Sequence, residues 1–109
     1  KLLDVDEKGN ATLLRVGILR ARYRSGNQAP TALEPGEVYE FTLDLWATSN
    51  QFKKGHRIAL WVTSSDFPQF ERNTNGGGEG GKGNIVIAKQ TIYHDPKRPS
   101  HLILPVIPR

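Results

Sequence analysis

Apolar and polar residues alternate along several short segments of this chain, and a period of two is typical of β-strands with one buried face. In EVYEFTLDLW (residues 37–46), every second residue from Tyr39 to Leu45 is apolar, and the residues between them are polar. We predict a strand here and in four other segments. These are LLDV at 2–5, RIALWVT at 57–63, IVIAKQTIY at 85–93 and HLILPVI at 101–107.

The segments between these strands are rich in Gly, Pro, Asn and Asp, which are the residues that form turns. They read EKGN, RSGNQAP, LEPGE, FKKGH, NTNGGGEGGKGN and HDPKRPS. No segment has a convincing helical pattern. Short strands separated by turn signals indicate an all-β fold, an antiparallel β-sandwich of jelly-roll type.

The predicted sandwich is incomplete, because a jelly roll has about eight strands and fewer can be counted here. The chain also contains no methionine, although translation begins with one. We therefore expect residues 1–109 to form a single β-sandwich domain that belongs to a longer protein. The N-terminal strands of the sandwich would lie upstream.

The composition is that of a folded domain, with 37% hydrophobic and 24% charged residues. The absence of cysteine excludes disulfides, thiolate metal sites and a cysteine nucleophile. No apolar run approaches the ~20 residues that a bilayer crossing needs, and the first residues lack the apolar segment of a signal peptide. We expect no membrane partner, and the sequence slightly favours the cytoplasm.

The net charge of +4 is concentrated in one segment, where Arg20, Arg22 and Arg24 occupy every second position. On a strand, the three guanidinium groups would share one face. Such a stripe could contact phosphates, but we favour a solvated face paired with the carboxylates of another strand, and we expect no nucleic-acid partner. The carboxylates expected there are Glu37, Glu40 and Asp44.

The glycine-rich tract NGGGEGGKG (residues 75–83) matches two phosphate-binding patterns in part. It fits G-x-G-x-x-G from Gly76 onward, and it fits most of a P-loop up to Lys82. However, Gly83 stands where a P-loop needs Ser or Thr, and a strand-like segment follows in place of a helix. We predict a mobile loop, without a bound nucleotide or any other cofactor.

Residues 52–75 bring His56, two serines and an aspartate close together in sequence, which raises the question of a serine hydrolase site. A nucleophilic serine needs a sharp turn such as the G-x-S-x-G elbow, and this motif does not occur in the chain. His56 precedes Ser64 on one predicted strand, ~26 Å away when extended, so the two cannot form a direct pair. We expect Ser64, Ser65 and Asp66 to form a turn, and the chain to hold no catalytic residue.

Zinc sites need ligands at characteristic spacings. The candidate ligands of this chain fit no such motif, so we expect no metal. These candidates are His56, His94, Asp95 and His101.

The loop after the strand at 57–63 places two phenylalanines in a polar segment, SSDFPQFERN. Exposed aromatic rings are unfavourable unless the core of the domain or a partner surface covers them. We favour a partner surface, which would also explain an outward-pointing tryptophan on the preceding strand and would find polar anchors at the end of the loop. The residues predicted at this domain interface are Trp61, Ser64, Ser65, Asp66, Phe67, Pro68, Phe70, Arg72 and Asn73.

Four stretches, in order along the chain, read GILRARYR, LEPGEVYEFTLDLWATSNQFKKGHRI, SSDFPQFERNTNGG and YHDPKRPSHLILPVIP. In this order they resemble the C-terminal non-catalytic domain of a family of bacterial serine hydrolases. The family includes X-Pro dipeptidyl peptidases, cocaine esterase, α-amino acid ester hydrolases and glutaryl cephalosporin acylases. The resemblance implies a jelly roll of galactose-binding-like type, packed against a separate α/β-hydrolase domain that holds the catalytic Ser, Asp and His. No triad position falls within the part that is matched.

The residues and the resemblance together predict a non-catalytic β-sandwich domain of a serine hydrolase. Its partner would be the α/β-hydrolase catalytic domain of the same protein, whose substrate entrance it would help to shape. The parent would hydrolyse esters, amides or X-Pro peptides by acyl transfer. An open sheet edge could also pair two copies of the chain. The alternative is a free-standing carbohydrate-binding module, in which Trp46, Trp61 and Tyr93 would stack on a sugar ring.

Overall fold

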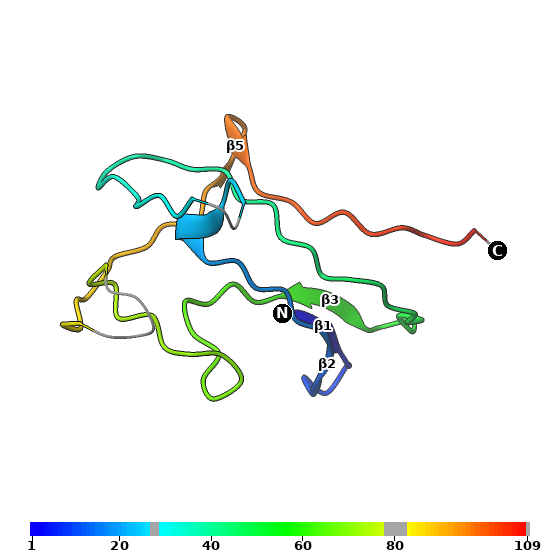
Figure 1. Cartoon of the computed structure of the whole chain (residues 1–109). Coiled ribbons are helices and arrows are strands. Elements are labelled where there is room, and N and C mark those ends of the chain that lie inside the picture. Colours follow the sequence, from blue (N-terminus) through cyan, green and yellow to red (C-terminus); the bar gives the residue numbers. More distant parts are fainter. Residues whose placement is uncertain (27–28, 78–82, 109) are drawn as a thin grey trace. The chain divides into compact units, whose positions relative to one another are not determined.

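The computed structural model describes residues 1–26, 29–77 and 83–108. Regular structure in these residues consists of five strands in two antiparallel sheets and one short 3-10 helix (Figure 1). The predicted all-β class is confirmed, whereas the jelly-roll arrangement stays a prediction. The elements are β1 (Leu2–Val5), β2 (Ala11–Arg15), η1 (Ala21–Tyr23), β3 (Arg57–Leu60), β4 (His94–Asp95) and β5 (Arg98–Pro99).

The chain separates into two compact units, residues 1–73 and residues 74–109. The first unit contains β1, β2, η1 and β3, and the second contains β4 and β5. Within the described ranges, no helix has the length and apolar character that a membrane crossing requires.

Strand β1 is the central strand of the first sheet, which has the order β2-β1-β3 (Figure 1). Its Leu2 and Leu3 are buried, and they point to opposite faces because successive residues of a strand alternate. The register with β3 places Leu2 opposite Leu60 and Leu3 opposite Ala59. The strand predicted at residues 2–5 is confirmed as β1. Of the strand predicted at residues 57–63, the first four residues are confirmed as β3.

The turn predicted at EKGN joins β1 to β2, and Asp6 stabilises it. One carboxylate oxygen of Asp6 accepts the backbone N–H groups of Lys8 and Asn10, both at 2.8 Å, and the other accepts the side-chain amide of Asn10 at 2.7 Å. Gly9 has a φ of 87°, a left-handed conformation that favours glycine. Strand β2 itself is not among the predicted strands, because ATLLR lacks a strict alternation.

The arginine-rich segment is not a strand, so the prediction of a shared guanidinium face is wrong. The N–H groups of Tyr23 and Arg24 donate to the carbonyl oxygens of Arg20 and Ala21, and these bonds form η1. With three residues per turn, alternate positions no longer lie on one side of the backbone. The pattern of charges alone could not distinguish the two conformations.

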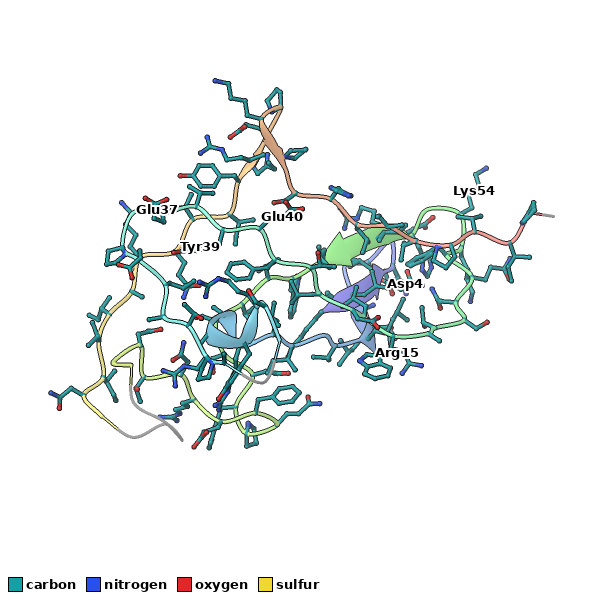
Figure 2. The ribbon with its side chains drawn as sticks, turned by 45° about the horizontal axis from the view of Figure 1, so that its top comes forward. Asp4, Arg15, Glu37, Tyr39, Glu40 and Lys54 are labelled. Atoms are coloured by element: carbon teal, nitrogen blue, oxygen red, sulfur yellow. The ribbon has the colours of Figure 1, made fainter. Side chains whose placement is uncertain are left out.

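Two of these arginines fasten η1 to neighbouring segments of the first unit. Arg20 Nη2 pairs with Glu71 Oε2 at 2.9 Å, and not with one of the carboxylates predicted above. Arg24 Nη1 donates to the carbonyl oxygen of Thr31 at 2.8 Å, and its guanidinium lies 4.6 Å from the centroid of the Tyr39 ring. Figure 2 labels Tyr39 with its neighbours Glu37 and Glu40 on the extended segment that Arg24 contacts.

Residues 37–46 form no strand in the described structure, which corrects the prediction made from their alternation. The segment is nevertheless fixed near its end, because Arg15 Nε donates to the carbonyl oxygen of Ala47 at 2.6 Å. A Cβ atom on Gly17 would lie 2.6 Å from the carbonyl oxygen of Asp44, so only glycine permits this close approach.

In the second unit, β4 and β5 form a hairpin at the predicted HDPKRPS turn. Two hydrogen bonds close the base of the glycine-rich loop: the Val86 N–H donates to the Thr74 carbonyl at 2.9 Å, and Asn75 Nδ2 donates to the Val86 carbonyl at 3.1 Å. Residues 78–82, the central part of the loop predicted to be mobile, lie outside the described residues.

The segments 85–93 and 101–107, which flank the hairpin, are not strands in the described structure, so these predictions are also corrected. Their isoleucines are largely exposed, and Ile87 is 98% exposed. A strand is defined by the backbone hydrogen bonds that it makes to a neighbour. Alternation predicts which face would be buried, but not whether a neighbouring strand is present.

Candidate functional site

The predicted contact loop, residues 64–73, leaves the first sheet at the end of β3, and we call it the aromatic loop. Two backbone hydrogen bonds extend the β1–β3 ladder toward it. The backbone nitrogen of Lys1 donates to the Trp61 carbonyl at 2.7 Å, and the Trp61 N–H donates to the Lys1 carbonyl at 2.9 Å. The start of the loop is therefore fixed by the sheet.

Asp66 fastens the aromatic loop in two ways. Its Oδ1 pairs with Lys1 Nζ at 2.5 Å, and both side chains are about three-quarters buried. Its carbonyl oxygen accepts the N–H of Phe70 at 3.0 Å, which closes the turn. Its Oδ2 is buried without a hydrogen-bond partner among the described residues. The loop is thus held by a shielded ion pair as well as by a backbone turn.

The two serines at the start of the loop lie before its turn, which residues 67–69 form between Asp66 and Phe70, so the turn predicted at Ser64, Ser65 and Asp66 is displaced along the chain. We expected the side chains of Ser64, Ser65 and Asp66 to bind nearby backbone amides. Instead, Thr63 Oγ1 donates to the carbonyl oxygen of Ser65 at 2.9 Å. The Asp66 carboxylate is occupied by a lysine that is 65 residues away in sequence.

The aromatic side chains of the loop are only partly covered. Phe67, which precedes Pro68 through a cis peptide bond, is 59% exposed, and Trp61 is 53% exposed, whereas Phe70 is half-buried. The guanidinium of Arg72 lies 4.6 Å from the centroid of the Phe67 ring and covers one of its faces. Apart from Trp61, which extends the β1–β3 ladder, the predicted interface residues thus lie in one fastened loop with an exposed ring.

His56 lies at the opposite end of β3 from the aromatic loop, so it does not meet Ser64 or Ser65. Its Nδ1 is 2.8 Å from Oδ1 of Asp4, which Figure 2 labels on β1. This pair was not found in the sequence, because its members are 52 residues apart. A Ser-His-Asp site needs its serine beside the histidine, and Ser64 and Ser65 lie beyond the far end of β3.

A shallow hollow of about 270 Å³ lies beside His56 and is lined by the β1–β2 turn. Hydrogen bonds from the side chain and backbone of Asn10, with smaller contributions from Lys8 and His56, lower the pKa of Asp6 below its ordinary value of 3.8 despite some desolvation. The Asp6 carboxylate is therefore committed to its own turn. Within the described part of the chain, no group of three or more His, Cys, Asp or Glu residues could hold a metal ion.

In the second unit, the Asp95 carboxylate is likewise bound by groups of its own hairpin. It accepts the N–H groups of Lys97 and Arg98 at 2.9 and 3.0 Å, and it pairs with Arg98 Nη2 at 3.0 Å. Arg98 also covers the ring of Tyr93, at 3.7 Å from the centroid, so one face of this predicted sugar-stacking residue is occupied. His101 Nδ1 lies 2.7 Å from the carbonyl oxygen of Pro99.

Residues 1–103 match the family described as the X-Pro dipeptidyl-peptidase C-terminal non-catalytic domain. The chain belongs to this family. The predicted resemblance is thereby confirmed, and so is the non-catalytic character of the domain. The separation of His56 from the serines beyond β3 agrees with this description.

Relatives of this X-Pro dipeptidyl-peptidase C-terminal domain are much longer proteins. The chain is 45% identical over 112 residues to cocaine esterase from Rhodococcus sp. (strain MB1 Bresler), an alignment that covers all of the chain and 20% of that protein. It is 31% identical over 86 residues to proteins named provisionally as serine esterases in Mycobacterium bovis and Mycobacterium tuberculosis, with 63% of the chain and 14% of each protein covered. No solved structure matches the chain.

Proposed function

We propose that this chain is the C-terminal β-sandwich domain of a longer serine hydrolase and that it packs against the α/β-hydrolase domain of the same polypeptide through the aromatic loop. There it helps to shape the substrate entrance. The parent cleaves esters, amides or X-Pro peptides through an acyl-enzyme, with its catalytic triad outside this chain. Membership in a non-catalytic domain family and similarity to a fifth of an esterase support this proposal.

The observation that carries the proposal is a loop that is firmly held and yet presents an aromatic ring to solvent. Asp66 fixes the loop through Lys1 and through the Phe70 N–H, while Phe67 is 59% exposed. Covering the exposed part of the ring would contribute about 2–3 kcal/mol, at ~25 cal/mol per Å² and about 150–250 Å² for a whole aromatic side chain. A fixed aromatic anchor of this kind is typical of the centre of a protein interface.

The same fastening supports a role at the substrate entrance. Because the ladder of β1 and β3 extends to Trp61, the aromatic loop is attached to the first sheet at its base. A surface that packs on such a loop loses conformational freedom. If that surface also lines the active site of the catalytic domain, the loop helps to hold its residues in the geometry that orients the substrate.

The decisive variant is Phe67→Ala in the full-length polypeptide, with Leu33→Ala as the matched control. Leu33 is also exposed in the first unit but lies outside the aromatic loop. We expect Phe67→Ala to destabilise the protein by about 2 kcal/mol or more, as for a central interface residue, and to reduce ester turnover. Thermal unfolding and steady-state hydrolysis of an aryl ester measure the two effects. Equal melting temperatures and turnover for Phe67→Ala and the unmodified protein would rule out docking through this loop.

The position of the nucleophile is tested separately with a fluorophosphonate probe, which labels activated serines. We expect the full-length polypeptide to react at a serine outside residues 1–109, located by mass spectrometry. Ser64 and Ser65 should stay unlabelled, because His56, the histidine of the same unit, lies at the other end of β3 and pairs with Asp4. A stoichiometric adduct on Ser64 or Ser65 would overturn the assignment of a non-catalytic role.

A further inference from the structure

The charges of the aromatic loop are balanced except at one residue. The loop carries three charged side chains, and two of them have partners within the first unit: Asp66 pairs with Lys1 at 2.5 Å, and Glu71 pairs with Arg20 at 2.9 Å. The third, Arg72, has no ionic partner among the described residues. One positive charge of the loop is therefore left over.

The Arg72 guanidinium lies beside the exposed ring of Phe67. Its guanidinium carbon lies 4.6 Å from the centroid of Phe67, the exposed ring on which the docking proposal rests. A guanidinium carries five N–H donors in one plane, and a contact with a ring leaves donors available for an oxygen acceptor. Phe67 and Arg72 therefore present an apolar ring and a planar set of donors as one surface.

We infer that the surface on which the aromatic loop docks is an apolar pocket for Phe67 rimmed by an Asp or Glu carboxylate, which binds the Arg72 guanidinium. The inference rests on the proposed function and specifies the partner: a carboxylate at the rim of an apolar pocket on the catalytic domain of the same polypeptide. Planar guanidinium donors match the two oxygens of a carboxylate, so the pair is directional as well as attractive.

Two arguments favour a carboxylate over other occupants. Docking removes water from Arg72, and a buried charge without a partner is strongly unfavourable, so the opposing surface has to supply an acceptor. A polyanion such as a nucleic acid requires several free cations, but Lys1 and Arg20 are already paired beside the loop. A single unpaired guanidinium is complementary to a single carboxylate.

The test uses the full-length polypeptide and the variants Arg72→Gln, Arg72→Lys and Arg72→Glu. The matched control is Arg57→Gln, which removes the same charge from an exposed position on β3. Hydrogen–deuterium exchange of peptides that cover residues 66–72 reports opening of the aromatic loop. We expect exchange to be about tenfold faster in Arg72→Gln, faster still in Arg72→Glu, and intermediate in Arg72→Lys, which keeps the charge but loses the planar donors.

Salt provides the second readout. At 1 M NaCl the Debye length is about 3 Å, so the difference between Arg72→Gln and the unmodified protein should become smaller. Arg57→Gln should leave exchange of the aromatic loop unchanged at both salt concentrations. If Arg57→Gln accelerates exchange as much as Arg72→Gln does, the effect comes from net charge and the inference is wrong.

The inference and the proposed function fail in different ways. If Phe67→Ala opens the loop while Arg72→Gln and Arg72→Glu exchange like the unmodified protein, the loop docks without a carboxylate, and the inference alone is overturned. If neither Phe67→Ala nor Arg72→Gln changes exchange, melting temperature or turnover, the loop is a free surface, and both are overturned.

Discussion

The hairpin of the second unit and the aromatic loop of the first are built from the same three kinds of residue: an aspartate, an aromatic ring and an arginine. In the hairpin, Arg98 lies over Tyr93 at 3.7 Å from its centroid, and it also pairs with Asp95 at 3.0 Å. The ring, the cation and the anion all lie within a few residues of one another. Within the hairpin, Arg98 and Asp95 therefore satisfy each other.

The aromatic loop distributes the same groups differently. Arg72 lies over Phe67 at 4.6 Å, but the aspartate of this loop, Asp66, is bound to Lys1. The arginine keeps its aromatic contact and lacks the anion. The hairpin supplies this carboxylate from its own turn, and in the proposed docking the catalytic domain would supply it to the aromatic loop.

The same three groups therefore stabilise a turn in the hairpin, whereas in the aromatic loop they leave the Arg72 guanidinium without a local carboxylate, which is the basis of the docking inference. The aspartate and arginine of the hairpin are three residues apart, which is close enough for a tight turn to join them. Those of the aromatic loop are six apart, and a long-range partner has taken the carboxylate. An arginine that contacts an aromatic ring therefore indicates a binding surface only where no carboxylate of its own turn pairs with it.

The largest effect on this comparison is expected from Asp66→Ala, which removes the ion pair with Lys1 and leaves a largely buried ammonium without a partner. We expect the aromatic loop to lose about 1–2 kcal/mol of stability against local opening. Hydrogen exchange at the Phe70 N–H, which donates to the Asp66 carbonyl, should become about five- to thirtyfold faster.

The matched control is Glu71→Gln, which breaks the other ion pair of the loop. Arg20 and Glu71 are about half exposed, so this pair should contribute 0–1 kcal/mol, as is usual for surface ion pairs. Faster exchange in Glu71→Gln than in Asp66→Ala would contradict the view that the shielded lysine–aspartate pair holds the loop.

The sequence was sufficient for features whose causes are local. The turn at Asp6 to Asn10 follows from an aspartate that can bind the N–H groups after it and from a glycine at the left-handed position. β1 and the first part of β3 follow from apolar residues between turn signals. The C-terminal domain family follows from four ordered stretches, because a long ordered match is far more specific than any single motif.

What the sequence could not supply were the partners of each segment. Residues 37–46, 85–93 and 101–107 alternate as strands do, yet they form no ladder in the described structure, because pairing depends on residues far away in sequence. For the same reason, the sequence could not show that Asp4 pairs with His56 or that Asp66 pairs with Lys1, because both pairs join residues far apart in the chain. The aromatic loop was predicted from its exposed rings, but the unpaired charge of Arg72 could be recognised only after the ion pairs were known.

The smallest expected effect is on the stability of the hairpin at Asp95, and it depends on pH. Some desolvation acts to raise the pKa of Asp95, but the hydrogen bonds from the N–H groups of Lys97 and Arg98 and from the Arg98 side chain outweigh it and lower the pKa below the ordinary value of 3.8. A lowered pKa means that the ionised form is favoured in the folded state. Its stabilising contribution is thus fully present above pH 3.8 and is lost as the pH falls through the folded value.

Titration of the Asp95 carboxyl carbon by NMR should therefore give a midpoint below 3.8, and exchange of the Arg98 N–H should accelerate only in that acidic range. Asp95→Asn should remove this acid response, because no carboxylate is then left to titrate at the turn. If the midpoint were 3.8 or higher, Asp95 would gain nothing from the donors around it. The contrast with the aromatic loop would then disappear, because Arg98, like Arg72, would gain no stabilisation from a carboxylate of its own turn.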